Sequence, residues 1–311
     1  MGEYGAQAIH RELTQSSQRS LTTVPSVRTI GRILTRRGAL DGRRRQRRLP
    51  PPRGWFLAEV AAGRAELDSF DIIEDLRIQD GPFVNVLTGI SLHGGLCAAW
   101  PRAHITAKNT VESLVQHWQT HGRPQYAKFD NDTIFQGAHQ WPDSFGRVIR
   151  VCLSLGVTPI FAPPREPGFQ AEIENFNGRW QTKVWGRFHF ETLGALRAQS
   201  TKFIAASFQC SAARREAAPA RRPFPKTWRL NLQQPLRGQV IFIRRTDERG
   251  LVSVLGHTYL ASRTWAQRLV RVEVDLTSGR LRIYALRRRD PQQQPLLKAH
   301  RYQTPKKLFH E

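Results

Sequence analysis

Acidic residues are scarce in this chain. Of its 311 residues, 25 are Asp or Glu and 48 are Lys or Arg, which gives a formal net charge of +23 and a pI near 11.3. The basic excess is spread along the whole sequence, so a polyanion is the natural partner, and counterion release would supply much of the affinity. Ribosomal proteins and membrane-surface binders share such a charge, so charge alone leaves those classes open.

Long apolar runs, nucleotide loops and paired cysteines are also missing. No run of about 18 apolar residues occurs and the N-terminus has no signal-peptide core, so we expect a cytoplasmic protein with no membrane partner. Cys97, Cys152 and Cys210 are too few and too scattered for a disulfide framework or a zinc motif, and we expect them to be buried small hydrophobes. No Gly-rich loop ends in Lys-Ser/Thr, which removes support for nucleotide hydrolysis.

The first 41 residues contain two short helical patterns, Ala6–Leu13 and Ser26–Arg37. Ser26 is placed to cap the second helix, and Gly38 stands where a helix C′ residue belongs. The pair predicts a helix-turn-helix piece over residues 1–41, whose second helix presents four arginines to DNA: Arg28, Arg32, Arg36 and Arg37. Residues 42–65 follow as a basic linker rich in Pro and Arg.

Residues 66–190 have the pattern of a folded α/β domain. Three successive strands, 67–78, 82–90 and 95–100, are separated by glycine turns, which favours an antiparallel meander. A helix capped by Thr106, a strand ending at Asp130, a helix, a strand and a helix bearing Glu174 follow in turn. The resulting order, βββαβαβα, is that of a ribonuclease H-like core.

Four short runs in this domain carry a family resemblance: Gly122-Arg123-Pro124, Phe129-Asp130-Asn131, Pro163-Pro164 with Gly168, and Ile173-Glu174-Asn175-Phe176-Asn177. Together they resemble the integrase catalytic core of insertion-sequence transposases and retroviral integrases, over roughly residues 66–187. The resemblance implies a DDE recombinase that uses two Mg²⁺ or Mn²⁺ ions and acts on element ends and target DNA as a homo-oligomer. In it, Asp130 matches the second Asp and Glu174 matches the Glu.

The first carboxylate ligand has two candidates on the first strand. Asp71 shares a strand face with Ile73, whereas Asp68 shares the opposite face with Phe70. The stretch from Phe70 to Glu74 resembles the aromatic-x-Asp opening of the family, so Asp71 is predicted as the ligand and Asp68 remains the alternative.

The chain also departs from the family pattern. Asp132 stands where Gly is usual after Asp-Asn, and 43 residues separate Asp130 from Glu174, more than is common. An insertion around 136–142 would explain the longer gap. The departures leave open a catalytically inactive or domesticated remnant that binds DNA, and a nuclease that cuts without joining is a further alternative.

Carboxylates are the hard oxygen ligands that such ions prefer, and two ions about 4 Å apart would activate the attacking hydroxyl and stabilise the leaving one. We expect Asp71 and Asp130 to share one ion, and Glu174 with one Asp to hold the other. Asn131 is expected to support Asp130. Along the helix after Glu174, Asn177 is expected to orient Glu174 or else to be a surface amide.

Phosphate contacts are predicted further along that helix, from Arg179 and Lys183. Glu172 is expected to face solvent, because it points away from Glu174 on a helix.

Five alternating segments after residue 236 predict short strands at 240–243, 252–255, 257–260, 269–274 and 281–286. They suggest a small closed β barrel over residues 236–290, which resembles the SH3-like C-terminal DNA-binding domain of integrases. Arg244, Arg245 and Arg271 are expected to contact DNA from this barrel. A helix and basic connector, residues 191–235, would precede it, and a basic tail, residues 291–311, would follow.

Overall fold

The computed structural model describes residues 5–15, 23–39, 50–78, 81–138, 141–166, 168–303 and 309. The chain divides into two compact units, Met1–Pro50 and Pro51–Glu311, and each is described here by itself. The arginine run at 43–48 lies outside the described residues. No helix in the described part of the chain is long and apolar enough to cross a bilayer.

The N-terminal unit contains helices α1 (Ala6–Gln15) and α2 (Val27–Arg36). The Ser26 hydroxyl accepts a hydrogen bond from the Thr29 backbone N–H at 3.2 Å, and Gly38 has a φ of +60°, so both predicted helix ends are confirmed. Ile30 is buried, while the four arginines predicted to face DNA are exposed on and just after α2. A helix-turn-helix stays a prediction.

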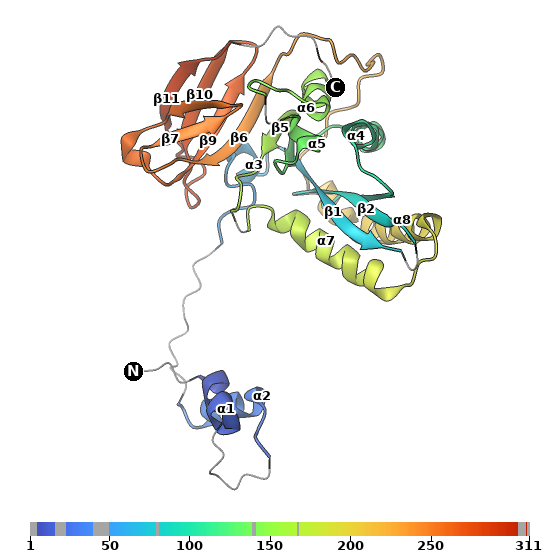
Figure 1. The fold of residues 1–311 in the computed structure, drawn as a ribbon, viewed down its shortest axis with the longest axis vertical. Coiled ribbons are helices and arrows are strands. Elements are labelled where there is room, and N and C mark those ends of the chain that lie inside the picture. Colours follow the sequence, from blue (N-terminus) through green and yellow to red (C-terminus); the bar gives the residue numbers. More distant parts are fainter. Residues whose placement is uncertain are drawn as a thin grey trace. The chain divides into compact units, whose positions relative to one another are not determined.

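In the described residues of the second unit, nine strands form one mixed sheet (Figure 1). Across the sheet the strands are β11 (Leu296–Arg301), β10 (Arg280–Ala285), β9 (Leu269–Asp275), β6 (Gln239–Arg245), β5 (Thr158–Phe161), β4 (Tyr126–Phe129), β1 (Leu67–Arg77), β2 (Phe83–Ser91) and β3 (Cys97–Arg102). Strands β1, β2 and β3 are antiparallel, and β4, β5 and β6 run parallel to β1. The predicted α/β core with its opening meander is confirmed.

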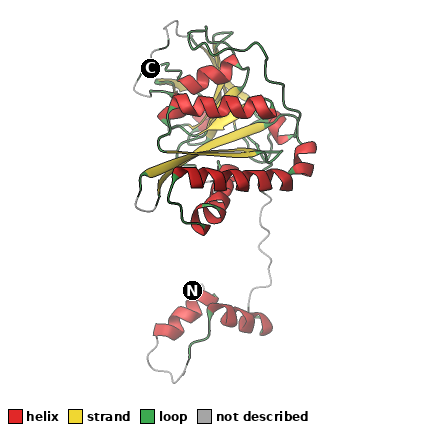
Figure 2. Cartoon of the chain, turned by 90° about the vertical axis from the view of Figure 1, so that its right-hand side faces the viewer, coloured by secondary structure: helices red, strands yellow, loops and turns green. Residues whose placement is uncertain are grey.

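Helices cover both faces of the sheet (Figure 2). The longer ones are α4 (Ala107–His121), α6 (Arg147–Ser154), α7 (Ala171–Lys183) and α8 (Leu193–Cys210), and the shorter ones are α3 (Ala58–Ala61), α5 (Thr133–Gln136) and α9 (Ala212–Glu216). The Thr106 hydroxyl caps α4 as predicted, by accepting from the Asn109 backbone N–H. Two 3₁₀ turns, Trp185–Arg187 and Arg263–Trp265, complete the described helical elements.

Side-chain alternation along β1 assigns its two faces to different helices. Phe70 packs edge-on against Trp118 of α4, with ring centroids 6.2 Å apart. Ile73 belongs to a buried cluster that contains Trp180 of α7. Because successive residues of a strand point to opposite faces, Asp68 faces the α4 side and Asp71 faces the α7 side.

The C-terminal strands correct one prediction. All five predicted strands are present, as β6, β7 (Leu251–Val254), β8 (His257–Leu260), β9 and β10, and β11 lies within the predicted tail. They do not confirm a separate closed barrel, because β6 pairs in parallel with β5 at Ile160↔Ile241 and Phe161↔Phe242 and continues the core sheet, while β7 and β8 form their own hairpin. Alternation identifies a strand but not its partner. Without β6, the outer edge of β5 would expose backbone groups that another strand can pair with, and β6 occupies this edge.

The segment between α5 and α6 lies within the long gap between Asp130 and Glu174 and contacts the C-terminal part of the unit. Its Asp143 carboxylate accepts a hydrogen bond from the Tyr302 hydroxyl at 2.7 Å and lies 2.9 Å from Nε2 of His257. Asp143 therefore links this segment to the C-terminal part of the unit. Of the three cysteines, Cys97 and Cys152 are buried as predicted, whereas Cys210 is exposed.

Candidate active site

Asp71 lies in the middle of β1 on the face covered by α7. The Asn177 amide of α7 donates a hydrogen bond to Asp71 Oδ2 at 2.8 Å, and the Thr88 hydroxyl of β2 donates to Asn177 Oδ1 at 2.8 Å. Asn177 is buried, so it is not a surface amide, and its hydrogen-bonded partner is Asp71 instead of Glu174. This chain of hydrogen bonds fixes the Asp71 carboxylate from two neighbouring elements.

Asp130 follows directly after β4 and lies beside Asp71. Strands β1 and β4 run parallel with Ser69 opposite Lys128, and Asp71 and Asp130 each stand two residues further along the same direction. The Asp130 Oδ1 atom accepts a hydrogen bond from the Asp132 backbone N–H at 3.0 Å. Asp132, found where a glycine was expected, caps helix α5 with its own carboxylate.

Glu174 is exposed in the first turn of α7. It lines the same hollow as Asp130. The pKa of Asp71 is raised to about 6, mainly by burial and in part by the negative charges of Asp130 and Glu174, while hydrogen bonds from the Ile72 backbone and Asn177 act to lower it. The three predicted carboxylates, from three different elements, are therefore close enough for their charges to interact.

A cation would relieve this concentration of negative charge, and carboxylate oxygens are the ligands that Mg²⁺ and Mn²⁺ prefer. Within the described residues, however, no three His, Cys, Asp or Glu side chains already stand as a group that could hold a metal ion. The three carboxylates are chemically suited to a divalent cation. In this structure they do not stand close enough together to form a complete set of ligands.

Asp68, the alternative first ligand, is held in a buried ion pair. The Arg221 guanidinium donates to its two carboxylate oxygens at 2.8 and 2.7 Å, and the Trp118 indole donates at 3.0 Å. Burial would raise the pKa of Asp68, but the adjacent Arg221 charge and its hydrogen bonds outweigh burial and lower it. Nothing local in the sequence links two residues 153 positions apart, and Arg221 belongs to the predicted basic connector.

A second buried ion pair lies between the strands and α7. Lys128 of β4 is fully buried and pairs with Glu172 of α7, and its ammonium also donates to the Phe169 carbonyl at 3.0 Å. The Ser69 hydroxyl of β1 donates to the same Glu172 carboxylate at 3.1 Å. Glu172 was expected to face solvent, and this expectation is wrong because the carboxylate compensates a lysine inside a buried strand. A lysine in the otherwise apolar β4 is the sequence signal for such a partner.

Two arginines expected to contact DNA point into the protein instead. Arg244 of β6 donates from Nη2 to Asn131 Oδ1 at 2.7 Å and from Nη1 to the Ala162 carbonyl at 3.1 Å. Burial lowers the pKa of Arg244 to about 10. Arg271 donates to the Phe56 carbonyl at 2.8 Å and pairs with Glu273. Both side chains are covered by segments far away in the sequence, which a strand pattern cannot show.

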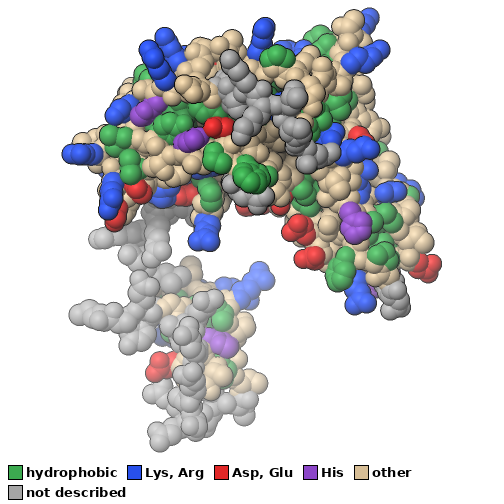
Figure 3. Space-filling view, turned by 45° about the horizontal axis from the view of Figure 1, so that its top comes forward, with side chains coloured by type: hydrophobic (Ala, Val, Ile, Leu, Met, Phe, Trp, Pro, Cys, Tyr) green, Lys and Arg blue, Asp and Glu red, His purple; other side chains and the backbone are tan. Residues whose placement is uncertain are grey.

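Other predicted DNA contacts remain on the surface. Arg179 and Lys183 are exposed along α7 beyond Glu174. Arg245 leaves 51% of its side chain exposed while it pairs with Glu166. Lys and Arg side chains also lie scattered across the face shown in Figure 3, without a single dominant patch.

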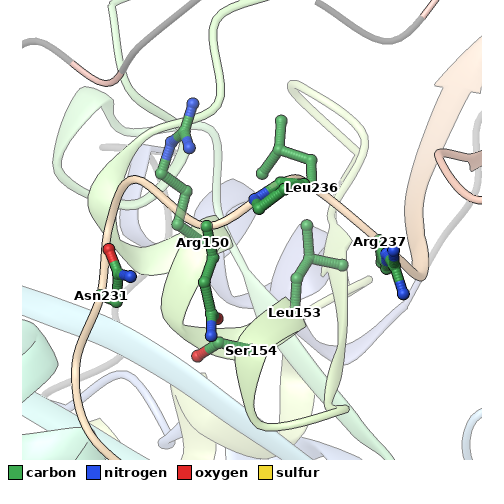
Figure 4. Close-up of a pocket in the computed structure, with 8 residues that line it drawn as sticks. Arg150, Leu153, Ser154, Asn231, Leu236 and Arg237 are labelled. Atoms are coloured by element: carbon green, nitrogen blue, oxygen red, sulfur yellow. The ribbon is translucent and has the colours of Figure 1, made fainter. Parts of the chain in front are cut away.

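Two hollows of the second unit are candidate sites for chemistry. The first, about 360 Å³, adjoins the carboxylates and is lined by Asp130, Asn131, Ala162, Pro163, Pro164, Arg165, Glu166, Phe169, Gln170 and Glu174. The second, about 310 Å³, lies between α6 and the segment before β6, with Arg150 and Ser154 on the helix side and Asn231 on the other (Figure 4). Its lining contains no carboxylate, so the first hollow is the candidate active site.

Comparisons with protein-family models and with curated proteins gave no match. Among solved structures, the chain is similar to a chain of the simian T-cell lymphotropic virus intasome in complex with PP2A regulatory subunit B56 gamma, at 14% identity and a TM-score of 0.42, covering 90% of this chain and 88% of that one. It is also similar to the HTLV-2 integrase catalytic core domain in complex with magnesium, at 12% identity and a TM-score of 0.34, covering 47% and 83%. The catalytic core domain of BIV integrase is 17% identical with a TM-score of 0.32, covering 44% and 81%. Such low values decide nothing about the chemistry, which rests on the geometry above.

Proposed function

We propose that this chain is a DDE-type DNA recombinase, a transposase or integrase that cleaves DNA ends and joins a 3′-hydroxyl to target DNA. What supports the proposal is that Asp130 and Glu174 line one hollow, that Asp71 lies on the strand adjacent to β4, and that burial together with the charges of Asp130 and Glu174 raises the pKa of Asp71. Clustered carboxylates whose pKa is shifted by burial and by neighbouring charges are candidates for a functional site.

The protein's own part in this reaction is to hold oxygen ligands in place. Asp71 and Asp130 would offer oxygens from adjacent parallel strands, and Glu174 would offer its oxygens from the facing helix. Bound Mg²⁺ or Mn²⁺ would supply charge stabilisation to the attacking and leaving oxygens of the phosphodiester. Asn177, itself held by Thr88, would keep Asp71 turned toward that position.

DNA is the substrate that the charge distribution favours. The net charge of +23 provides long-range attraction for a polyanion. Arg179 and Lys183 follow Glu174 along α7 and are exposed, so they would offer positive charge to DNA phosphates along this helix. The arginines of α2 would add contacts from the N-terminal unit.

The test uses purified full-length protein with Mn²⁺, a plasmid target and short duplexes that cover the DNA flanking the coding sequence. A duplex with a 3′-hydroxyl should be joined to the plasmid, and the same duplex with a 3′-dideoxy end should not. Asp130→Asn should abolish joining while it preserves DNA binding, because the amide keeps the shape and loses the charge. Glu112→Gln, at an exposed site on α4, is the matched control and should join normally.

Two outcomes would replace the proposal. Cleavage without joining would identify a nuclease. DNA binding with neither activity would identify a DNA-binding protein that has lost its chemistry.

A further inference from the structure

Arg244 connects the C-terminal strands to the candidate active site. It lies on β6, 113 positions from Asn131, yet its guanidinium donates to the Asn131 side chain at 2.7 Å. Asn131 is the residue directly after Asp130. The contact therefore reaches the turn that carries one of the three carboxylates.

The same guanidinium also holds the loop after β5. It donates to the Ala162 carbonyl at 3.1 Å, and the Asn131 amide donates to that same carbonyl at 2.7 Å. Arg244, Asn131 and Ala162 form a closed triangle of hydrogen bonds. Asn131 and Ala162 both line the hollow beside Asp130 and Glu174, so the triangle forms part of its wall.

Packing alone does not require a charged residue at this position. The guanidinium lies 5.1 Å from the centre of the Phe242 ring, within a largely apolar strand. Burying a charge is costly, and apolar side chains of similar size often serve stability as well as buried charged ones do. An apolar side chain cannot donate hydrogen bonds to the Asn131 and Ala162 oxygens. The planar guanidinium of arginine can donate to both at once.

We propose that Arg244 is a positioning residue of the active site, which holds Asn131 and Ala162 so that Asp130 faces the space between Asp71 and Glu174. This inference rests on the proposed function. It assigns the C-terminal strands a part in the catalytic unit, in place of a separate DNA-binding module.

The test combines Arg244→Gln, Asn131→Ala and the double variant in the full chain. Each single change should weaken Mn²⁺ binding, measured by calorimetry without DNA, by about 10- to 100-fold, with a similar loss in the rate of strand transfer at saturating DNA. The double variant should lose no more than the worse single variant, because both changes break the same triangle. Arg244→Lys, which keeps the charge but not the fork, should recover only part of the loss.

Arg249→Gln is the matched control, since Arg249 is exposed on the turn after β6 and should behave as wild type. Thermal unfolding of every variant identifies losses caused by misfolding, and Asn131→Ala probes the same link if Arg244→Gln does not fold. If both single variants bind Mn²⁺ as tightly as wild type, the inference is overturned while the proposed function stands. The same holds if the losses of the two single variants multiply in the double variant. A wild-type protein that neither binds Mn²⁺ nor joins DNA would overturn the proposed function as well.

Discussion

Removal of the C-terminal strands should unfold the second unit, although the sequence pattern suggests a detachable barrel. Deletion of residues 236–311 takes away β6, which has four consecutive side chains that are at most 1% exposed: Val240, Ile241, Phe242 and Ile243. Phe242 stacks on Phe161 of β5, with ring centroids 5.2 Å apart. Each such side chain contributes about 1.5–3 kcal/mol when buried, so the loss from β6 alone is roughly 6–12 kcal/mol. That is comparable with the entire stability of about 5–15 kcal/mol typical of a folded protein.

The assay is urea unfolding followed by circular dichroism. Residues 1–235 should show no cooperative transition and should be degraded rapidly by protease. Deletion of residues 1–50, which form the other compact unit, is the matched control and should leave the transition of the second unit unchanged. A fragment 1–235 that unfolds cooperatively, with a stability within about 2 kcal/mol of the full chain, would refute the continuous-sheet reasoning.

Two further predictions concern buried charges. Glu172→Gln should destabilise the protein by about 3–5 kcal/mol in urea unfolding, because the fully buried Lys128 loses its carboxylate partner. The double variant Lys128→Met/Glu172→Gln should recover much of that loss, and a Glu172→Gln protein as stable as wild type would contradict this pairing. In the metal-free protein, the raised pKa of Asp71 means that the folded state keeps a proton that the unfolded state has lost, so stability should fall as pH rises from about 4 to about 6, by at most about 3 kcal/mol. Asp71→Asn should remove this part of the pH dependence, and an unchanged slope would show that Asp71 is not the group responsible.

Local pattern predicted the helices and strands of the core, whereas Asp130 and Glu174 were predicted as ligands from the family resemblance of the runs around them. Alternation and helix caps placed the strands of the core, and Asp130 could be recognised because an apolar strand ends in Phe129 just before it. The two faces of β1 could also be assigned from alternation. The choice of Asp71 over Asp68 followed from the family resemblance of the stretch from Phe70 to Glu74, whereas the helix packed on each face is tertiary information.

Partners far apart in the sequence could not be predicted. Arg221 and Arg244 stand in basic or alternating segments that resemble DNA-binding surfaces, yet each donates to a side chain more than 100 positions away. A local sequence pattern indicates which positions alternate between buried and exposed. It does not indicate that an arginine donates to an acceptor far away in the sequence. The same limitation produced the expectation of a closed barrel, because the pairing of β6 with β5 is a property of the assembled sheet.

The most direct test of the central claim compares the two aspartates of β1 in strand transfer, with each rate normalised to the folded fraction of the protein. Asp71→Asn should abolish joining of a 3′-hydroxyl end, because the site loses a ligand charge. Asp68→Asn should lower stability, because Arg221 loses its partner, but should keep joining per folded molecule within about threefold of wild type. Normal joining by Asp71→Asn, or its loss only in Asp68→Asn, would contradict the assignment of Asp71, Asp130 and Glu174 as the catalytic set.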